Sequence, residues 1–168
     1  YTQNSETGRL ESGCGALEFA RTQELVLRYL PPPPATVFDI GGGVGAYARW
    51  LSELGHRVHL LDLVESQARE ARRVPRLRSV VVGDAQALPY GAAGADAALL
   101  LGPLYHLTGR PARMAALREA RRLLRSGGLL VASAISRYAS LLDALAAGWI
   151  DEPGALPMVQ RDLREGQH

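Results

Sequence analysis

Lysine is absent from this 168-residue chain, so arginine supplies all 19 of its basic side chains. Because 17 acidic residues oppose them, the net charge is only +2, and the charge balance gives no argument for a nucleic-acid or membrane partner. Together with abundant alanine, leucine and glycine, the lack of lysine is typical of a high-GC bacterial coding bias rather than of a function.

Cysteine is nearly absent as well, since Cys14 is the only one. A single cysteine excludes an internal disulfide and a cysteine-based metal site, and we expect no metal. The sequence has no long apolar run, and no charged segment leads into a short apolar one. We therefore expect no membrane span, no signal peptide and a cytoplasmic location.

Short apolar segments alternate with amphipathic ones along the rest of the chain. The apolar runs predict five strands, at 36–40, 57–61, 79–82, 95–101 and 129–133. Spacings of three and four predict helices at about 16–30, 46–54, 65–73, 111–124 and 138–147. This alternation predicts an α/β fold: a Rossmann-like, doubly wound, mostly parallel sheet with helices on both faces. The arginine-rich side of 111–124 indicates a solvated helix face.

The length predicts one domain, residues 1–168. Within it, residues 1–34 are interpreted as an N-terminal arm and helix, and residues 35–135 as a cofactor-binding core. Residues 136–168 are expected to form a C-terminal helix and a polar tail interrupted by Pro153 and Pro157.

A glycine-rich turn follows the first predicted strand, and Asp39 stands directly before it. Glycine lets the backbone turn tightly and lets a ligand approach closely, and the helix that follows offers free N–H groups. Gly41, Gly43 and Ala46 satisfy the dinucleotide pattern G-x-G-x-x-G/A. Read alone, the turn therefore predicts a nucleoside cofactor but does not distinguish a dinucleotide from another nucleoside.

Acidic residues near the ends of three successive strands separate the candidate cofactors. A carboxylate at Asp39 would repel the pyrophosphate of a dinucleotide and attract a cation. Asp62, 23 residues further on, is placed to take ribose hydroxyls, and Asp84 can accept a hydrogen bond from adenine. S-adenosylmethionine (SAM) carries adenine, ribose, a sulfonium and an amino group but no phosphate, so three acids favour it over NAD. Each acid also has a plainer interpretation, as a helix cap, a loop acid or a turn residue.

Five motifs in order resemble the class I SAM-dependent methyltransferases of the small-molecule type. They span roughly residues 36–133, and each is weak singly. The motifs are Val37-Phe38-Asp39-Ile40-Gly41-Gly42-Gly43-Val44-Gly45, Leu60-Leu61-Asp62-Leu63, Gly83-Asp84-Ala85-Gln86-Ala87-Leu88-Pro89, Asp96 to Leu107 and Arg121 to Leu130.

The resemblance implies SAM as the cofactor, S-adenosylhomocysteine as its product, and a set of residues around the methionyl part. Three glycines of the turn would pass beneath it: Gly41, Gly43 and Gly45. Asp39 would reach toward the amino group, directly or through water, and Leu101 and Gly102 would close over this end with backbone carbonyls. Arg21 is a further candidate, for the methionyl carboxylate.

The resemblance also implies the residues around the nucleoside. Asp62 would bind both ribose hydroxyls, with Leu63 against the adenine face. Asp84 would hold the adenine amino group, and the backbone N–H of Ala85 would hold the ring.

Methyl transfer from a sulfonium is an in-line displacement, so the protein mainly has to align the acceptor and exclude water. No fixed catalytic triad is expected. His106 and Tyr105, after the fourth strand, are candidates for a general base, and a structural hydrogen-bonding role is the alternative. The chain has neither a Pro-Pro-Tyr motif there nor a Pro-Cys pair, which favours a small-molecule acceptor methylated on O, N or C and no nucleic-acid substrate.

The methyltransferase sheet of this family has seven strands, whereas the sequence predicts five. We therefore expect either a truncated or partly ordered C-terminal edge or an edge that is completed differently. An open edge strand invites pairing with another chain, for example in a homodimer. This leaves a non-catalytic SAM-binding or regulatory domain as an alternative to an enzyme. An NAD-type oxidoreductase is a weaker alternative.

Overall fold

The computed structural model describes residues 13–92 and 94–166. The chain divides into two compact units, with the boundary between Ser133 and Ala134. The first unit contains the sheet and the second is helical. The predicted organisation as one domain stays a prediction.

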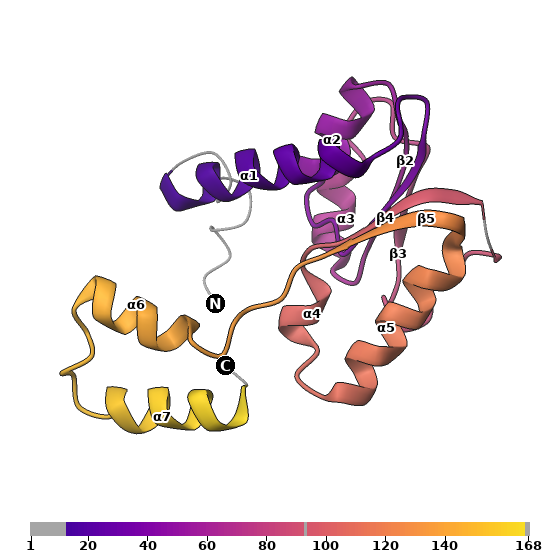
Figure 1. The fold of residues 1–168 in the computed structure, drawn as a ribbon. Coiled ribbons are helices and arrows are strands. Elements are labelled where there is room, and N and C mark those ends of the chain that lie inside the picture. Colours follow the sequence, from indigo (N-terminus) through magenta and orange to yellow (C-terminus); the bar gives the residue numbers. More distant parts are fainter. Residues whose placement is uncertain (1–12, 93, 167–168) are drawn as a thin grey trace. The chain divides into compact units, whose positions relative to one another are not determined.

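Five strands form one sheet in the order β3-β2-β1-β4-β5, and every neighbouring pair is parallel (Figure 1). The three central strands, β2, β1 and β4, are apolar and mostly buried, as parallel strands covered on both faces require. The predicted α/β, Rossmann-like fold is confirmed. The strands are β1 (Thr36–Ile40), β2 (Arg57–Asp62), β3 (Ser79–Val82), β4 (Ala95–Leu100) and β5 (Leu124–Ala132).

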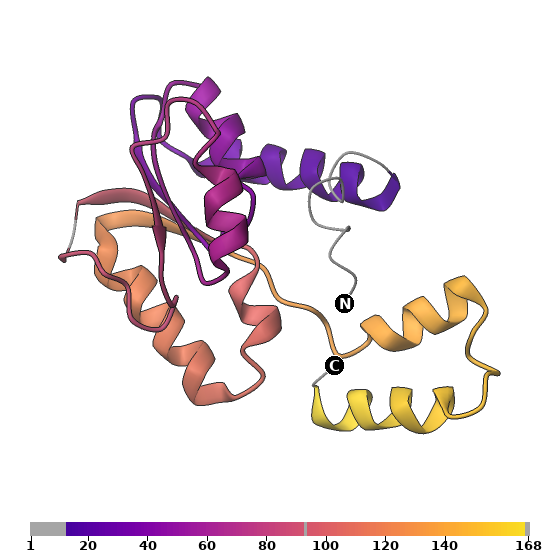
Figure 2. The same ribbon diagram turned by 180° about the vertical axis from the view of Figure 1, so that it is seen from behind.

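Helices cover both faces of this sheet (Figures 1 and 2). One core lies between the sheet and α1 (Gly13–Tyr29), α2 (Ala46–Glu53) and α3 (Glu65–Ala71). The other lies between the sheet and α5 (Arg110–Leu123), together with the loop before β4. Val37 of β1 and Leu60 of β2 have no exposed surface, which fixes the centre of the sheet.

Three local features differ from the sequence prediction. The short helix α4 (Pro103–His106) follows β4, and β5 begins at Leu124 rather than at residue 129. β5 pairs with β4 on both sides of an irregularity, so Gly127 and Gly128, which precede the predicted strand, lie within β5. The tail contains α7 (Ala155–Glu165). Pro157 is tolerated there because the first helical turn needs no donor from it.

The second unit consists of α6 (Ala139–Ala147) and α7. Ser140 donates a hydrogen bond of 2.6 Å to the carboxylate of Asp162, a residue that is only 2% exposed. A guanidinium nitrogen of Arg137 donates to the carbonyl of Leu163 at 3.3 Å. These contacts join the beginning of α6 to the end of α7.

Candidate functional site

The glycine turn lies at the carboxyl end of β1, beside the end of β2. The amides of Gly41 and Gly42 both donate to the carbonyl of Leu61, at 2.7 and 3.2 Å. Gly41 has a φ of +70°, and a Cβ on it would lie 2.5 Å from Cγ of Pro103. Only glycine satisfies both the left-handed backbone and this close approach. The loop after β4 therefore packs directly on the turn.

Asp39 lies underneath the turn and is only 2% exposed. Its Oδ2 has no hydrogen-bond partner among the described residues, and a Cβ on Gly42 would come within 2.7 Å of that oxygen. Burial, and then the negative charge of Asp62, raise the pKa of Asp39 to about 7, while a backbone N–H of Ala48 acts in the opposite direction. A buried, unpartnered carboxyl is costly unless a ligand or a proton compensates it.

Asp62 ends β2 and is 6% exposed, so it is not a loop acid on the surface. One of its oxygens accepts the amide of Gly43 at 2.8 Å, and the other accepts the amide of Val64 at 2.8 Å. The side chain thus braces the glycine turn against the start of α3. Each carboxylate oxygen has a second lone pair, so these bonds leave acceptor sites for hydroxyl groups.

Asp84 follows β3 by two residues and closes a turn of its own. Its Oδ1 accepts the backbone N–H of Gln86 at 2.8 Å, and the Gln86 amide nitrogen lies 3.2 and 3.3 Å from its two oxygens. Ala85 beside it is buried, whereas Leu63 is 68% exposed. Leu63 directly follows Asp62, and its exposed side chain is suited to pack against the flat face of a nucleobase.

The end of β4 is tied to the end of β5 by hydroxyl groups. Ser133 donates to the carbonyl of Leu101 at 2.7 Å. Because the single proton of that hydroxyl is used there, the phenol of Tyr105 donates to the Ser133 oxygen. A Cβ on Gly102 would lie 3.3 Å from the Gly41 carbonyl oxygen. Tyr105 therefore holds the loop over the glycine turn, while His106 is exposed to solvent.

Arg21 is an exposed residue of α1 and pairs with Glu24, which also accepts from Arg28 at 2.9 Å. The pKa of Glu24 is lowered, mainly by its hydrogen bond to Arg21. The proposed contact of Arg21 with a methionyl carboxylate requires this pair to open, and it stays a prediction.

Arg122 departs from the solvated helix face predicted for the arginines of α5: Arg118 and Arg121 are exposed, whereas Arg122 is half-buried and has partners in the fold. Its guanidinium donates to the carbonyls of Tyr90 and Leu88 at 2.8 and 3.2 Å, and to Glu119. Glu119 in turn accepts the Leu88 amide at 2.9 Å. This cluster holds the loop that carries Asp84. The i,i+3 spacing of Glu119 and Arg122 is a weak sequence signal for it.

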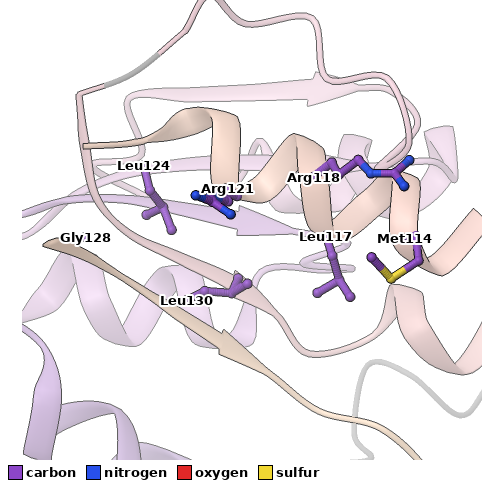
Figure 3. Close-up of a pocket in the computed structure, with 7 residues that line it drawn as sticks. All are labelled: Met114, Leu117, Arg118, Arg121, Leu124, Gly128 and Leu130. Atoms are coloured by element: carbon purple, nitrogen blue, oxygen red, sulfur yellow. The ribbon is translucent and has the colours of Figure 1, made fainter. Parts of the chain in front are cut away.

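An open groove of about 430 Å³ lies between α5 and β5 (Figure 3). It shares no residue with the acids and glycines described above, so it gives no support to a cofactor there. Its lining is apolar with two arginines on it: Met114, Leu117, Arg118, Arg121, Leu124, Gly128 and Leu130. β5 lies at the edge of the sheet and pairs only with β4 among the described residues.

Comparison with known proteins identifies the family. A family model described as a methyltransferase domain matches residues 38–132, which is more than half of the chain. The chain belongs to the class I SAM-dependent methyltransferases. This family uses SAM, so the membership decides between the two cofactors that the glycine turn alone left open.

The methyltransferase chain resembles individual proteins over part of their length. It is 30% identical over 151 residues to a malonyl-[acyl-carrier protein] O-methyltransferase of Erwinia pyrifoliae, covering 89% of this chain and 51% of that protein. The SAM-bound structure of CalS10, an amino pentose methyltransferase of Micromonospora echinaspora, matches with a TM-score of 0.64 at 27% identity, covering 79% and 56%. The PH0226 protein of Pyrococcus horikoshii matches with the same TM-score at 22% identity, covering 82% and 64%. The methyltransferase chain therefore spans about half the length of the curated relative.

Two further observations concern metals and membranes. In residues 13–92 and 94–166, no group of three or more His, Cys, Asp or Glu side chains is placed to hold a metal ion. No helix in that part of the chain has both the length and the apolar character needed to cross a bilayer.

Proposed function

We propose that this domain binds SAM at the carboxyl ends of β1, β2 and β3 and transfers its methyl group to an O, N or C atom of a small molecule. The observation that carries the proposal is the unpartnered oxygen of Asp39 beneath a glycine turn that is held by Asp62. A buried acid with one oxygen free of described partners suits the positively charged end of SAM and opposes a pyrophosphate.

The remaining residues then have distinct tasks. Asp62 accepts hydrogen bonds from the ribose hydroxyls, while the hydrogen bonds that it accepts from two backbone amides keep the turn in place. Leu63 packs against the face of the adenine. Asp84 accepts a hydrogen bond from the adenine amino group, and the backbone N–H of Ala85 donates one to the ring. The glycines at 41, 43 and 45 and the Leu101–Gly102 backbone enclose the methionyl part.

Bound SAM would supply an activated methyl group, so the chain's own residues mainly position the acceptor and exclude water. Tyr105 acts through the loop that it holds, because its hydroxyl is engaged with Ser133. His106 is the exposed candidate for accepting a proton from the acceptor. We further propose a small-molecule acceptor with no nucleic-acid partner, and a homodimer that covers the open sheet edge.

The acceptor atom is proposed from the relatives alone. The curated relative is named as an O-methyltransferase, which makes carboxyl and hydroxyl acceptors the first to test. An amine panel follows from the amino pentose methyltransferase structure.

The test incubates the chain with SAM and a panel of carboxylic acids, thioester-linked acids, alcohols and amino sugars, and quantifies S-adenosylhomocysteine by mass spectrometry. We expect acceptor-dependent product with the wild type and at least a tenfold loss with Asp62→Asn. Binding of S-adenosylhomocysteine without turnover on any acceptor would instead favour a non-catalytic SAM-binding domain. Absence of both binding and turnover from folded protein would refute the proposal.

A further inference from the structure

Two carboxyl groups interact electrostatically at the glycine turn, those of Asp39 and Asp62, and their surroundings are unequal. Asp62 accepts two backbone N–H groups, from Gly43 and Val64, each at 2.8 Å. Hydrogen bonds of this kind favour the ionised form of a carboxyl group. Asp39 is 2% exposed, and its Oδ2 accepts no hydrogen bond within the part of the chain that the structure describes. If the pair holds one proton, the geometry places it on Asp39.

The other neighbours of Asp39 supply no compensating charge. It pairs with Leu60 of β2 and Leu99 of β4 in the sheet, and the glycine turn covers it. Among the described residues, α2 contributes one backbone N–H to Asp39, that of Ala48, and the charged side chain that acts on it is Asp62. No described cation neutralises the pair, so a proton or a bound cation has to do so.

The free oxygen of Asp39 also packs directly against the glycine turn. A Cβ on Gly42 would be 2.7 Å from it, so no side chain stands between the carboxyl and the backbone of Gly42. At a buried carboxylate such as Asp39, the interaction with an ammonium is much stronger than in water.

We propose that Asp39 carries a proton in the ligand-free site and releases it when the ammonium group of the cofactor's methionyl part binds, so that binding exchanges a proton for a cation. The O–H bond of the Asp39 carboxyl breaks and the proton passes to solvent, while the ammonium keeps its own protons. The inference rests on the proposed cofactor site and adds a dependence of affinity on pH.

The linkage has a direction and a size. Below pH 7, where Asp39 is protonated in the free protein, affinity should fall about tenfold for each pH unit, because one proton must leave. At pH 6 binding should release about 0.9 proton, and at pH 7 about half a proton. An α-amino group loses its proton only near pH 8, so the ligand contributes little at pH 6.

Isothermal titration of S-adenosylhomocysteine into the full chain measures this directly. At pH 6 the observed heat is compared in buffers of low and high ionisation enthalpy, and the slope gives the number of protons released. Adenosine is the matched control ligand, because it shares the nucleoside but lacks the ammonium, and it should release no proton. Glu53→Gln is the control variant, since Glu53 is an exposed acid on α2, and it should leave the slope unchanged.

The outcomes separate the inference from the proposed function. Binding of S-adenosylhomocysteine with no proton release, or with equal release by adenosine, would overturn the inference and leave the cofactor site standing. Absence of any binding by folded protein would refute the cofactor site itself. Infrared difference spectra give a second readout that needs no variant: the absorption of a protonated carboxyl should disappear when the ligand is added at pH 6. Its persistence would overturn the inference.

Discussion

Replacing Asp39 with asparagine should stabilise the methyltransferase domain, and the gain should grow with pH. The carboxyl is buried and its Oδ2 is unpartnered, and its pKa is raised from 3.8 to about 7 in the folded protein. The unfolded chain therefore loses this proton near pH 4, whereas the folded chain keeps it up to about pH 7. Between these values the folded state binds the extra proton, so stability falls as pH rises.

The magnitude follows from the two pKa values. At ~1.4 kcal/mol per pKa unit, holding Asp39 ionised at high pH costs the fold about 4 kcal/mol. Of this, about 2.5 kcal/mol is lost between pH 5 and pH 8. Asparagine has nearly the same shape and does not titrate. Asp39→Asn should therefore remove this pH-dependent loss, and it should be more stable than the wild type at pH 8.

The assay is urea unfolding at pH 5, 6, 7 and 8, monitored by tryptophan fluorescence. The chain has two tryptophans, Trp50 in the sheet unit and Trp149 in the helical unit. Both proteins are therefore made with Trp149→Phe, which leaves Trp50 to report on the sheet unit. The pKa of the buried His56 is lowered by burial, and its titration in this range is common to both proteins and cancels in the difference.

Parallel stability profiles for wild type and Asp39→Asn would refute the reasoning, because they would show that Asp39 does not titrate in this window. A variant that is less stable than the wild type at every pH, but lacks the wild-type fall between pH 5 and pH 8, would still support it. In that case the asparagine amide adds a fixed cost of an unsatisfied donor. A buried titratable group that lowers the stability of the fold, as Asp39 does, is expected at sites that bind ligands.

The remaining predictions concern the surroundings of the site. Gly42→Ala should abolish detectable S-adenosylhomocysteine binding and lower the unfolding free energy by about 1–3 kcal/mol, because its Cβ would lie 2.7 Å from Asp39. Titration and unfolding curves of the variant that match those of the wild type would contradict this prediction. Ser133→Ala removes a 2.7 Å bond to the carbonyl at the end of β4, so it should cost about 1 kcal/mol and weaken the same binding several-fold; unchanged affinity would show that the loop needs no such tie. Arg122→Met should lower the unfolding free energy by about 1–3 kcal/mol, because two loop carbonyls and a glutamate lose their donor. Arg118→Met, on the same helix, should change it by less than about 0.5 kcal/mol, and equal effects would contradict the assigned role.

Local sequence pattern predicted most of the sheet unit. Strands at 36–40 and 79–82 have the predicted bounds, and those at 57–62 and 95–100 differ by one residue. Apolar runs and their flanking glycines are properties of neighbouring residues, so they can be read without knowing the fold. The prediction was less accurate where a contact between distant segments decides: β5 begins early because Leu124 pairs with Ala95.

Residue type and spacing are enough to predict the fold class, the family and the acids near three strand ends. What those acids do depends on contacts that form only when the chain folds. The tertiary structure buries Asp39 and leaves its Oδ2 without a hydrogen-bond partner in the part of the chain that the structure describes. It also bonds Asp62 to two backbone amides and Tyr105 to Ser133. Burial and hydrogen-bond partners arise when segments tens of residues apart pack together, and these two properties set the charge of an acid and the role of a hydroxyl.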